Sequence, residues 1–125
     1  MSENKKILLV DDEADIALAL SLGLESNGFS VDTFTSSITA LTNFKSDFYK
    51  LALLDIKIPE MDGIELYKKI RDKDKKIKVC FVSAYDVDYH TVKEYSTCII
   101  KKPITLEDLL KRINTELKKT SINGI

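Results

Sequence analysis

The sequence predicts an α/β protein in which one parallel β-sheet lies between two layers of helices, a three-layer sandwich. Short apolar runs alternate along the chain with segments of helical periodicity, which is typical of βα units joined by right-handed crossovers. The runs are continuously apolar, which indicates strands buried on both faces. At 125 residues the chain has the length of one domain, 1–125, for which we expect a core over about 5–119 and a short flexible tail at 120–125.

Five strands are expected, at 5–10, 29–34, 51–55, 78–82 and 97–100. The first is followed directly by Asp11 and Asp12, and the third ends at Asp55. The repeated pattern of an apolar run followed by a carboxylate predicts that acidic groups gather where strands end.

Five helices are expected between and after these strands. The first lies within 13–27, and its apolar residues fall at helical spacing: Ile16, Ala17, Leu20 and Leu24. Asn27 and Gly28 supply its stop signal. Ser36 or Ser37 caps a second helix, whose apolar positions are Ile38, Leu41, Phe44 and Phe48.

The third helix follows the break at 59–63, and its apolar residues are Ile64, Leu66, Tyr67 and Ile70. A brief fourth helix is expected within 86–96. Thr105 caps the last helix, which carries an apolar face: Leu106, Leu109, Leu110, Ile113 and Leu117.

The amino-acid composition argues against disordered, nucleic-acid-binding and membrane-embedded proteins. The apolar fraction of 44% and the charged fraction of 31% indicate a folded globular chain, and the formal net charge of −1 gives no sign of nucleic-acid or anionic membrane binding. No apolar run approaches the roughly 20 residues of a membrane span, and the first residues do not form a secretory signal. We therefore expect a cytoplasmic protein.

Cys80 and Cys98 lie in apolar stretches without CxxC spacing or a nearby histidine pair, so a zinc site is not expected. Buried free thiols are the favoured interpretation. His90, the only histidine, is expected to be solvated, and the lysines within 73–78 are expected to form a solvated loop.

Polar side chains should converge beyond the carboxyl ends of the strands, where ligands bind in parallel α/β sheets. Ser83 ends the fourth strand and Lys102 follows the fifth, so they would join Asp11, Asp12 and Asp55. Crowded carboxylates repel one another, and a hard cation such as Mg²⁺ would keep them ionised. Asp55 would then be a nucleophile suited to phosphoryl transfer.

These motifs resemble the receiver domain of two-component response regulators, over essentially the whole chain. Residues 7–13, ILLVDDE, are similar to the family's acidic pair, and residues 53–63, LLDIKIPEMDG, to its phosphorylation strand and loop. Residues 81–84, FVSA, resemble its switch motif, and Lys102-Pro103 its Lys-Pro, which usually has a cis peptide bond. The resemblance implies a chemotaxis-like, flavodoxin-like sheet of order 2-1-3-4-5.

It also implies the roles of residues. Asp55 would accept a phosphoryl group from the phosphohistidine of a sensor histidine kinase or phosphotransfer protein, and Ser83 and Lys102 would contact the phosphoryl oxygens. Asp12, Asp55 and the backbone carbonyl of Lys57 would bind Mg²⁺ directly, with Asp11 acting mainly through water. The chain would then be a signalling domain that catalyses only its own phosphorylation and dephosphorylation.

The tuning positions depart from the family pattern. Ile99 stands where receivers usually carry Tyr or Phe, and the fourth helix is expected to be short. Small Ala84 leaves room for the phosphoryl group and Pro103 completes the Lys-Pro motif. Lys57 and Tyr85 occupy positions that influence water access, and we hypothesise that bulky Tyr85 prolongs the life of the phosphoryl group.

One other function remains open, and a second is disfavoured. A receiver-like interaction module that acts independently of phosphorylation would fit the missing aromatic residue. An aspartyl-phosphate phosphatase of the haloacid-dehalogenase type would need a second Asp where this chain has Lys57. Any downstream target would dock on the face of the fourth helix, fifth strand and fifth helix, where cationic residues are available: Lys111, Arg112, Lys118 and Lys119. Neither nucleic acid nor membrane is an expected partner.

Overall fold

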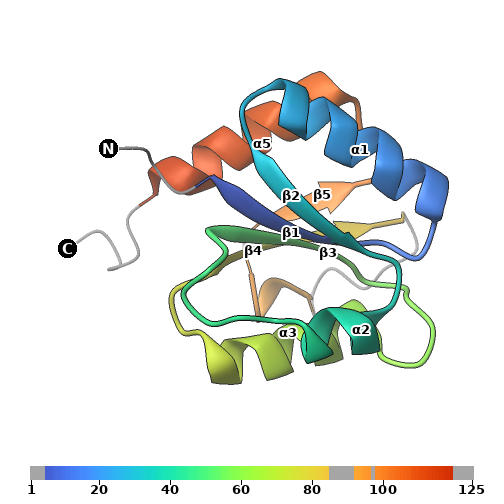
Figure 1. The fold of residues 1–125 in the computed structure, drawn as a ribbon, viewed down its shortest axis with the longest axis vertical. Helices are drawn as coiled ribbons and strands as arrows, with labels where there is room; N and C mark the ends of the chain where they lie inside the picture. The colour runs from blue at the N-terminus through green and yellow to red at the C-terminus, as the bar shows by residue number, and fades with distance from the viewer. Residues whose placement is uncertain (1–4, 85–91, 97, 120–125) are drawn as a thin grey trace.

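The computed structural model describes residues 5–84, 92–96 and 98–119. Its described part forms a fully parallel sheet of order β2-β1-β3-β4-β5 (Figure 1). The strands are β1 (Lys6–Val10), β2 (Ser30–Phe34), β3 (Leu51–Asp55), β4 (Lys78–Ser83) and β5 (Ile99–Lys101). The predicted fold class and strand order are confirmed.

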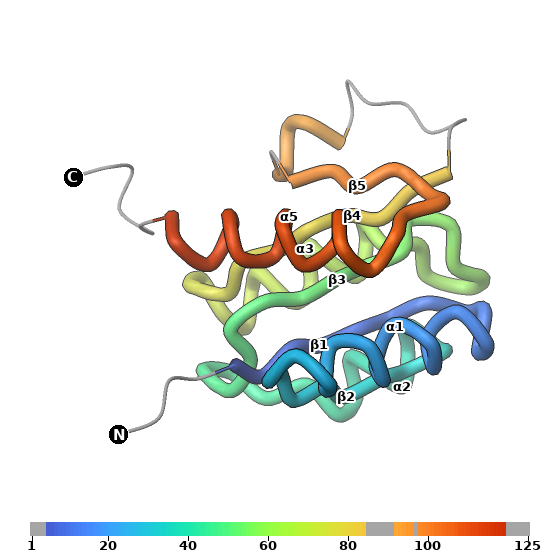
Figure 2. Tube along the Cα trace, turned by 90° about the horizontal axis from the view of Figure 1, so that it is seen from above, coloured from blue at the N-terminus to red at the C-terminus, as the bar shows by residue number. Residues whose placement is uncertain are grey.

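Helices cover both faces of the sheet. Helices α1 (Ala14–Ser26) and α5 (Leu106–Lys118) lie side by side on one face. Helices α2 (Ser37–Thr42) and α3 (Gly63–Lys73) lie on the other, as Figures 1 and 2 show. None of the described helices is long and apolar enough to cross a membrane.

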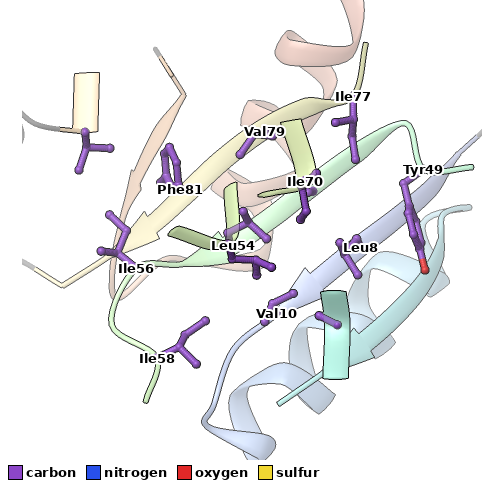
Figure 3. Close-up of a cluster of buried hydrophobic side chains, with 14 residues drawn as sticks. Leu8, Val10, Tyr49, Leu54, Ile56, Ile58, Ile70, Ile77, Val79 and Phe81 are labelled. Atoms are coloured by element: carbon purple, nitrogen blue, oxygen red, sulfur yellow. The ribbon is translucent and has the colours of Figure 1, made fainter. Parts of the chain in front are cut away.

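Alternate residues of the central strands feed two separate cores, because successive side chains of a strand point to opposite faces. Leu8, Val10 and Leu54 pack toward α2 and α3 (Figure 3), whereas Ile7 and Leu9 pack toward α1 and α5. Every residue of β3 is buried. This explains why the sequence of β3 is a continuous apolar run.

Side-chain caps fix three helix starts. The hydroxyl of Ser36 accepts a hydrogen bond from the amide of Thr39 (3.2 Å), and that of Thr105 accepts one from Asp108 (3.1 Å). Both caps were predicted. A carboxylate oxygen of Asp62 does the same for α3.

The second helix is shorter than predicted. It ends at Thr42, so Phe44 and Phe48 belong to the following loop. Asp47 in this loop has φ 60°, a left-handed conformation, and its amide donates to the side chain of Asp74 (2.9 Å). Phe44 and Phe48 instead pack their rings against Tyr49.

The predicted fourth helix lies mostly outside the described residues, as do Tyr85 and His90. Its described end, 92–96, closes with a turn in which the amide of Ser96 donates to the carbonyl of Val92 (3.2 Å). The fifth strand is Ile99–Lys101, two residues later at its start than the predicted range.

The prediction of free thiols is wrong, although both cysteines are fully buried as expected. Cys80 and Cys98 form a disulfide between neighbouring strands. The register of β4 and β5 pairs Phe81 with Ile99, so the residues just before that pair face each other across the sheet. Spacing along the chain does not reveal this pairing, because it depends on which strands are neighbours.

We expect reduction of the Cys80–Cys98 bond to lower the free energy of unfolding. The bond closes a loop with a sequence separation of 18, and a loop of that size corresponds to about 3 kcal/mol of lost unfolded-state entropy. Denaturant unfolding with and without a dithiol reductant measures the difference. The Cys80→Ala/Cys98→Ala double variant should be insensitive to the reductant, and alkylation of both thiols in unreduced, unfolded protein would contradict the bond.

Asp74, at the C-terminal end of α3, is buried and serves the backbone. Its carboxylate accepts hydrogen bonds from the amides of Asp47 (2.9 Å), Lys76 (2.9 Å) and Ile77 (3.1 Å). Burial alone would raise the pKa of Asp74, but these amides and the charge of Arg71 lower it below its ordinary value of 3.8. The carboxylate thus ties the loop before β3 to the loop before β4.

Asp74→Ala should lower the free energy of unfolding by about 3 kcal/mol at neutral pH, because it leaves buried amides unpaired. Since the folded-state pKa is depressed, the contribution of the ionised carboxylate is complete above pH 3.8 and is lost as the pH falls through the folded-state value. Denaturant unfolding at neutral and strongly acidic pH should therefore show a smaller loss in acid. Exposed Asp72→Ala is the matched control and should change stability little; an equal loss in both variants would contradict the assignment.

Candidate functional site

The carboxylate of Asp55 lies at the carboxyl end of β3 and is nearly buried, with 6% of the residue exposed. One of its oxygens accepts a hydrogen bond from the amide of Lys57 (3.2 Å), and the other accepts one from the ammonium of Lys102 (2.8 Å). The loop after β3 and the segment after β5 therefore both orient this carboxylate.

Lys102 binds several acidic groups at once. Its Nζ lies 3.1 Å from Asp11 Oδ2, 2.8 Å from Asp55 Oδ2 and 3.5 Å from Glu13 Oε1. The amide of Lys102 donates to the carbonyl of Ser83 (2.8 Å), which holds the segment after β5 against the end of β4. One ammonium thus connects the ends of β1, β3 and β5.

The three acidic residues after β1 differ in burial and in whether their carboxylates lie near Lys102. Asp11 is buried, and its second oxygen accepts the amide of Glu13 (2.9 Å) at the start of α1. Asp12 is exposed, and its carboxylate is not among the group of acids that surround Lys102. Sequence reasoning missed Glu13, although the third acid in a row at a helix start was a usable signal.

Ser83 ends β4 and is completely buried. Its hydroxyl has no hydrogen-bond partner among the described residues. Buried hydroxyls are nearly always paired, because an unmet one costs about 1–3 kcal/mol. The hydroxyl is therefore available to a group that enters the site.

Close backbone packing positions the loop that follows Asp55. Gly63 donates its amide to the carbonyl of Ile56 (2.8 Å), and a Cβ at Gly63 would collide with the backbone carbonyl of Asp55. Asp62 caps α3 through the amide of Glu65 (2.9 Å). Only glycine lets the first turn of α3 approach the end of β3 so closely.

A family model of the response regulator receiver domain matches residues 7–114. This chain belongs to the response regulator receiver family. The receiver protein CpdR of Brucella abortus is 30% identical over 90% of this chain and 97% of its own length. A CheY-like receiver domain from Methanospirillum hungatei, of known crystal structure, is 30% identical, covers 92% of this chain and 94% of its own, and has a TM-score of 0.80.

Other curated relatives are longer. The alkaline phosphatase synthesis transcriptional regulatory protein PhoP of Bacillus subtilis is 30% identical over 95% of this chain, which spans only 51% of PhoP. The receiver described here thus corresponds to a part of such regulators.

The electrostatics of the site are set by one cation among three acids. Burial raises the pKa of the Asp55 carboxyl, as does the charge of Asp11, against the opposing effect of Lys102. Burial by itself would lower the pKa of Lys102, but its hydrogen bonds to Asp55 and Asp11 raise it well above the ordinary value. Lys102 therefore stays an ammonium, and the three acids outnumber it.

This donor set fits a hard divalent cation. Carboxylate oxygens of Asp11, Glu13 and Asp55 lie within 4.8 Å of one another. Two of these acids are buried, and oxygen donors of this kind suit Mg²⁺, which keeps several of its waters. A divalent ion would balance the excess negative charge of the receiver site.

The predicted tuning positions lie around this edge of the sheet. Ala84 follows Ser83 and is half-buried, and Pro103 follows a cis peptide bond, as the resemblance implied. Ile99 is half-buried at the start of β5, and its carbonyl accepts a hydrogen bond from Arg112 (3.2 Å). Tyr85 lies outside the described residues, so its effect on phosphoryl lifetime stays a hypothesis.

Replacing Ser83 by Ala should leave the receiver as stable or raise its free energy of unfolding by about 1 kcal/mol, because it removes a buried hydroxyl that has no partner within residues 5–84, 92–96 and 98–119. Ser96→Ala is the matched control. The Ser96 hydroxyl donates to the carbonyl of Val79 (2.7 Å) and accepts the amide of Cys98 (3.0 Å), so its loss should be destabilising. Denaturant unfolding compares the two; equal destabilisation would show that the Ser83 hydroxyl has a partner.

Proposed function

We propose that this receiver accepts a phosphoryl group on Asp55 from the phosphohistidine of a sensor histidine kinase or phosphotransfer protein, in a Mg²⁺-dependent reaction. The single observation that carries the proposal is the position of the Asp55 carboxylate. It is held by Lys102 at the carboxyl edge of the sheet, where β4 ends in the buried Ser83, whose hydroxyl has no hydrogen-bond partner among the described residues. The family assignment supports the same role.

The chain's own residues account for the transfer. A carboxylate oxygen of Asp55 attacks phosphorus, an O–P bond forms, and the P–N bond of phosphohistidine breaks with its electron pair returning to the imidazole. Lys102 neutralises charge on the phosphoryl oxygens, and the hydroxyl of Ser83 donates a hydrogen bond to one of them. Both contacts stabilise a transition state whose charge is spread over these oxygens.

A bound Mg²⁺ would supply further neutralisation of the phosphoryl oxygens and of the crowded acids. Asp11, Glu13 and Asp55 are the acids whose oxygens lie close together. The direct-ligand roles of Asp12 and the Lys57 carbonyl stay predictions from the family resemblance. Exposed Asp12 would have to turn toward the cluster to take part.

For the output we propose a downstream target that docks near β5 and α5. Ile99 lies at the start of β5, and Arg112 of α5 donates to its carbonyl (3.2 Å) and to the sulfur of Cys98 (3.5 Å). These contacts link the strand before Lys102 to the outer helix, so a change at Lys102 can reach the surface. A module that works without phosphate is the alternative, favoured by the absence of an aromatic ring at position 99.

The decisive experiment is intact mass spectrometry after incubation with Mg²⁺ and phosphoramidate, whose P–N bond resembles that of phosphohistidine. Wild-type protein should gain one phosphoryl group, and Asp55→Asn should gain none. Removal of Mg²⁺ with a chelator should reduce the wild-type yield strongly, because the acids around Asp55 then repel an anionic donor.

Asp72→Asn is the matched control, because it removes an exposed carboxylate on α3 and should be phosphorylated like the wild type. A phosphoryl group on Asp55→Asn would assign the acceptor to another residue. Failure of the folded wild type to gain any phosphate would favour the phosphate-independent module.

A further inference from the structure

A second concave site lies at the opposite end of β4 from Ser83. It is a pocket of about 400 Å³ formed by the end of α3, the connection into β4, residues 93–96 and α5. The lining residues are Arg71, Lys75, Lys76, Ile77, Lys78, Val79, Lys93, Glu94, Tyr95, Ser96 and Glu116. β4 runs from Lys78 to Ser83, which places the two sites roughly 17 Å apart.

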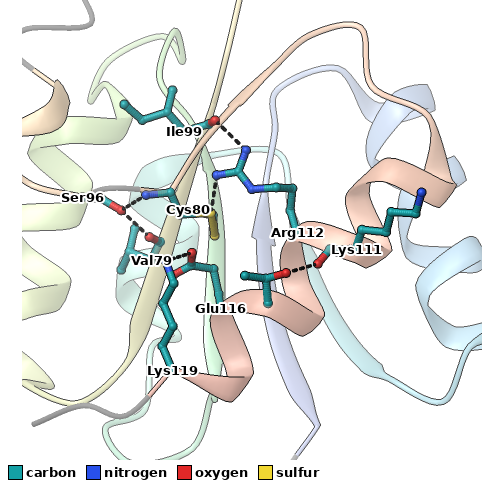
Figure 4. The surroundings of a disulfide bond; sticks show 10 residues. Val79, Cys80, Ser96, Ile99, Lys111, Arg112, Glu116 and Lys119 are labelled. Atoms are coloured by element: carbon teal, nitrogen blue, oxygen red, sulfur yellow. Dashed lines mark hydrogen bonds and ion pairs between the residues drawn. A yellow bond between two sulfur atoms is a disulfide. The ribbon is translucent and has the colours of Figure 1, made fainter. Parts of the chain in front are cut away.

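The lining of this pocket is strongly cationic. Five of its side chains are Lys or Arg, and two are acidic. Glu116, one of the two acids, is bonded to Lys119 (2.7 Å), as Figure 4 shows. Glu94 is therefore the only lining acid without a cationic partner among the described residues.

Asp72 and Asp74 lie close to these lysines in the sequence, but neither carboxylate forms an ion pair with them among the described residues. Asp74 points inward to three backbone amides. Asp72 is exposed on α3 and does not line the pocket. Neither carboxylate is therefore one of the side chains that line the pocket.

Basic residues are favoured at the C-terminus of a helix, but the C-terminus of α3 accounts for only one of the five cations of the pocket. Arg71 donates to the carbonyl of Asp74 (3.2 Å), as a cation at a helix C-terminus often does. Lys75, Lys76 and Lys78 lie beyond the last turn of α3, and Lys93 comes from a different segment. The described residues place no carboxylate within ion-pair distance of these four ammonium groups.

We propose that this pocket binds a small molecule that carries two or more phosphate groups. Several unbalanced cations around one concave volume produce a positive potential that a compact polyanion would neutralise. Lys contributes point charges toward phosphate, and Arg71 adds a guanidinium. The volume lies in the range of small-molecule sites.

Isothermal titration calorimetry at physiological ionic strength, without Mg²⁺, tests the proposal with two probes, pyrophosphate and ATP. Saturable binding of one molecule per chain is expected. The Lys75→Gln/Lys93→Gln variant should bind about tenfold more weakly, because two lining charges from different segments of the chain are lost. Equal affinity for the probes would indicate recognition of two phosphates alone, whereas tighter binding of ATP would indicate that its third phosphate or its nucleoside adds contacts.

The matched control is Lys69→Gln/Lys118→Gln, which removes the same charge from exposed positions outside the pocket. It should bind like the wild type. Equal weakening in both double variants, no saturable binding, or binding of an oligonucleotide but of neither probe would overturn the proposal. Asp55→Asn should bind both probes normally, so a failure here is distinct from a failure of the phosphorylation proposal.

Discussion

The ammonium of Lys102, bonded to Asp55 and Asp11, is the interaction on which the arrangement of this receiver's site depends. Those two carboxylates end neighbouring parallel strands, and Lys102 follows β5 at the far edge of the sheet. Without the ammonium, buried acids would face one another at short range and repel. The same contact that allows these acids to be buried also fixes the position of the Asp55 carboxylate at the carboxyl edge of the sheet.

The strands and most of the candidate site were predictable from the sequence because parallel sheets impose simple rules. A strand buried on both faces must be apolar throughout, so β1 and β3 could be recognised from their composition. The carboxyl ends of parallel strands share one edge, so the grouping of Asp11, Asp55 and Lys102 could be predicted from the sequence alone. The cap residues Ser36 and Thr105 were predictable for a similar reason, since free amides at a helix start require an acceptor.

The features that were missed depend on contacts between distant segments. Pairing of Cys80 with Cys98 follows from the register of β4 and β5, which the spacing along the chain does not contain. The loop after α2 carries Asp47 in a left-handed conformation, and this loop is held by a bond to Asp74, 27 residues later. Glu13 was overlooked because the acidic pair before it already satisfies the family pattern.

The close packing of Gly63 limits which positions of α3 can be substituted. Its backbone packs directly against the carbonyl end of β3, so the first turn of α3 and the strand that ends at Asp55 are in close contact. Exchange of the outer surface of α3 would leave that contact intact, whereas any side chain at position 63 would push the loop outward and displace Asp55 with it. New surface specificity can therefore be engineered on the exposed side of α3, provided that Gly63 remains a glycine.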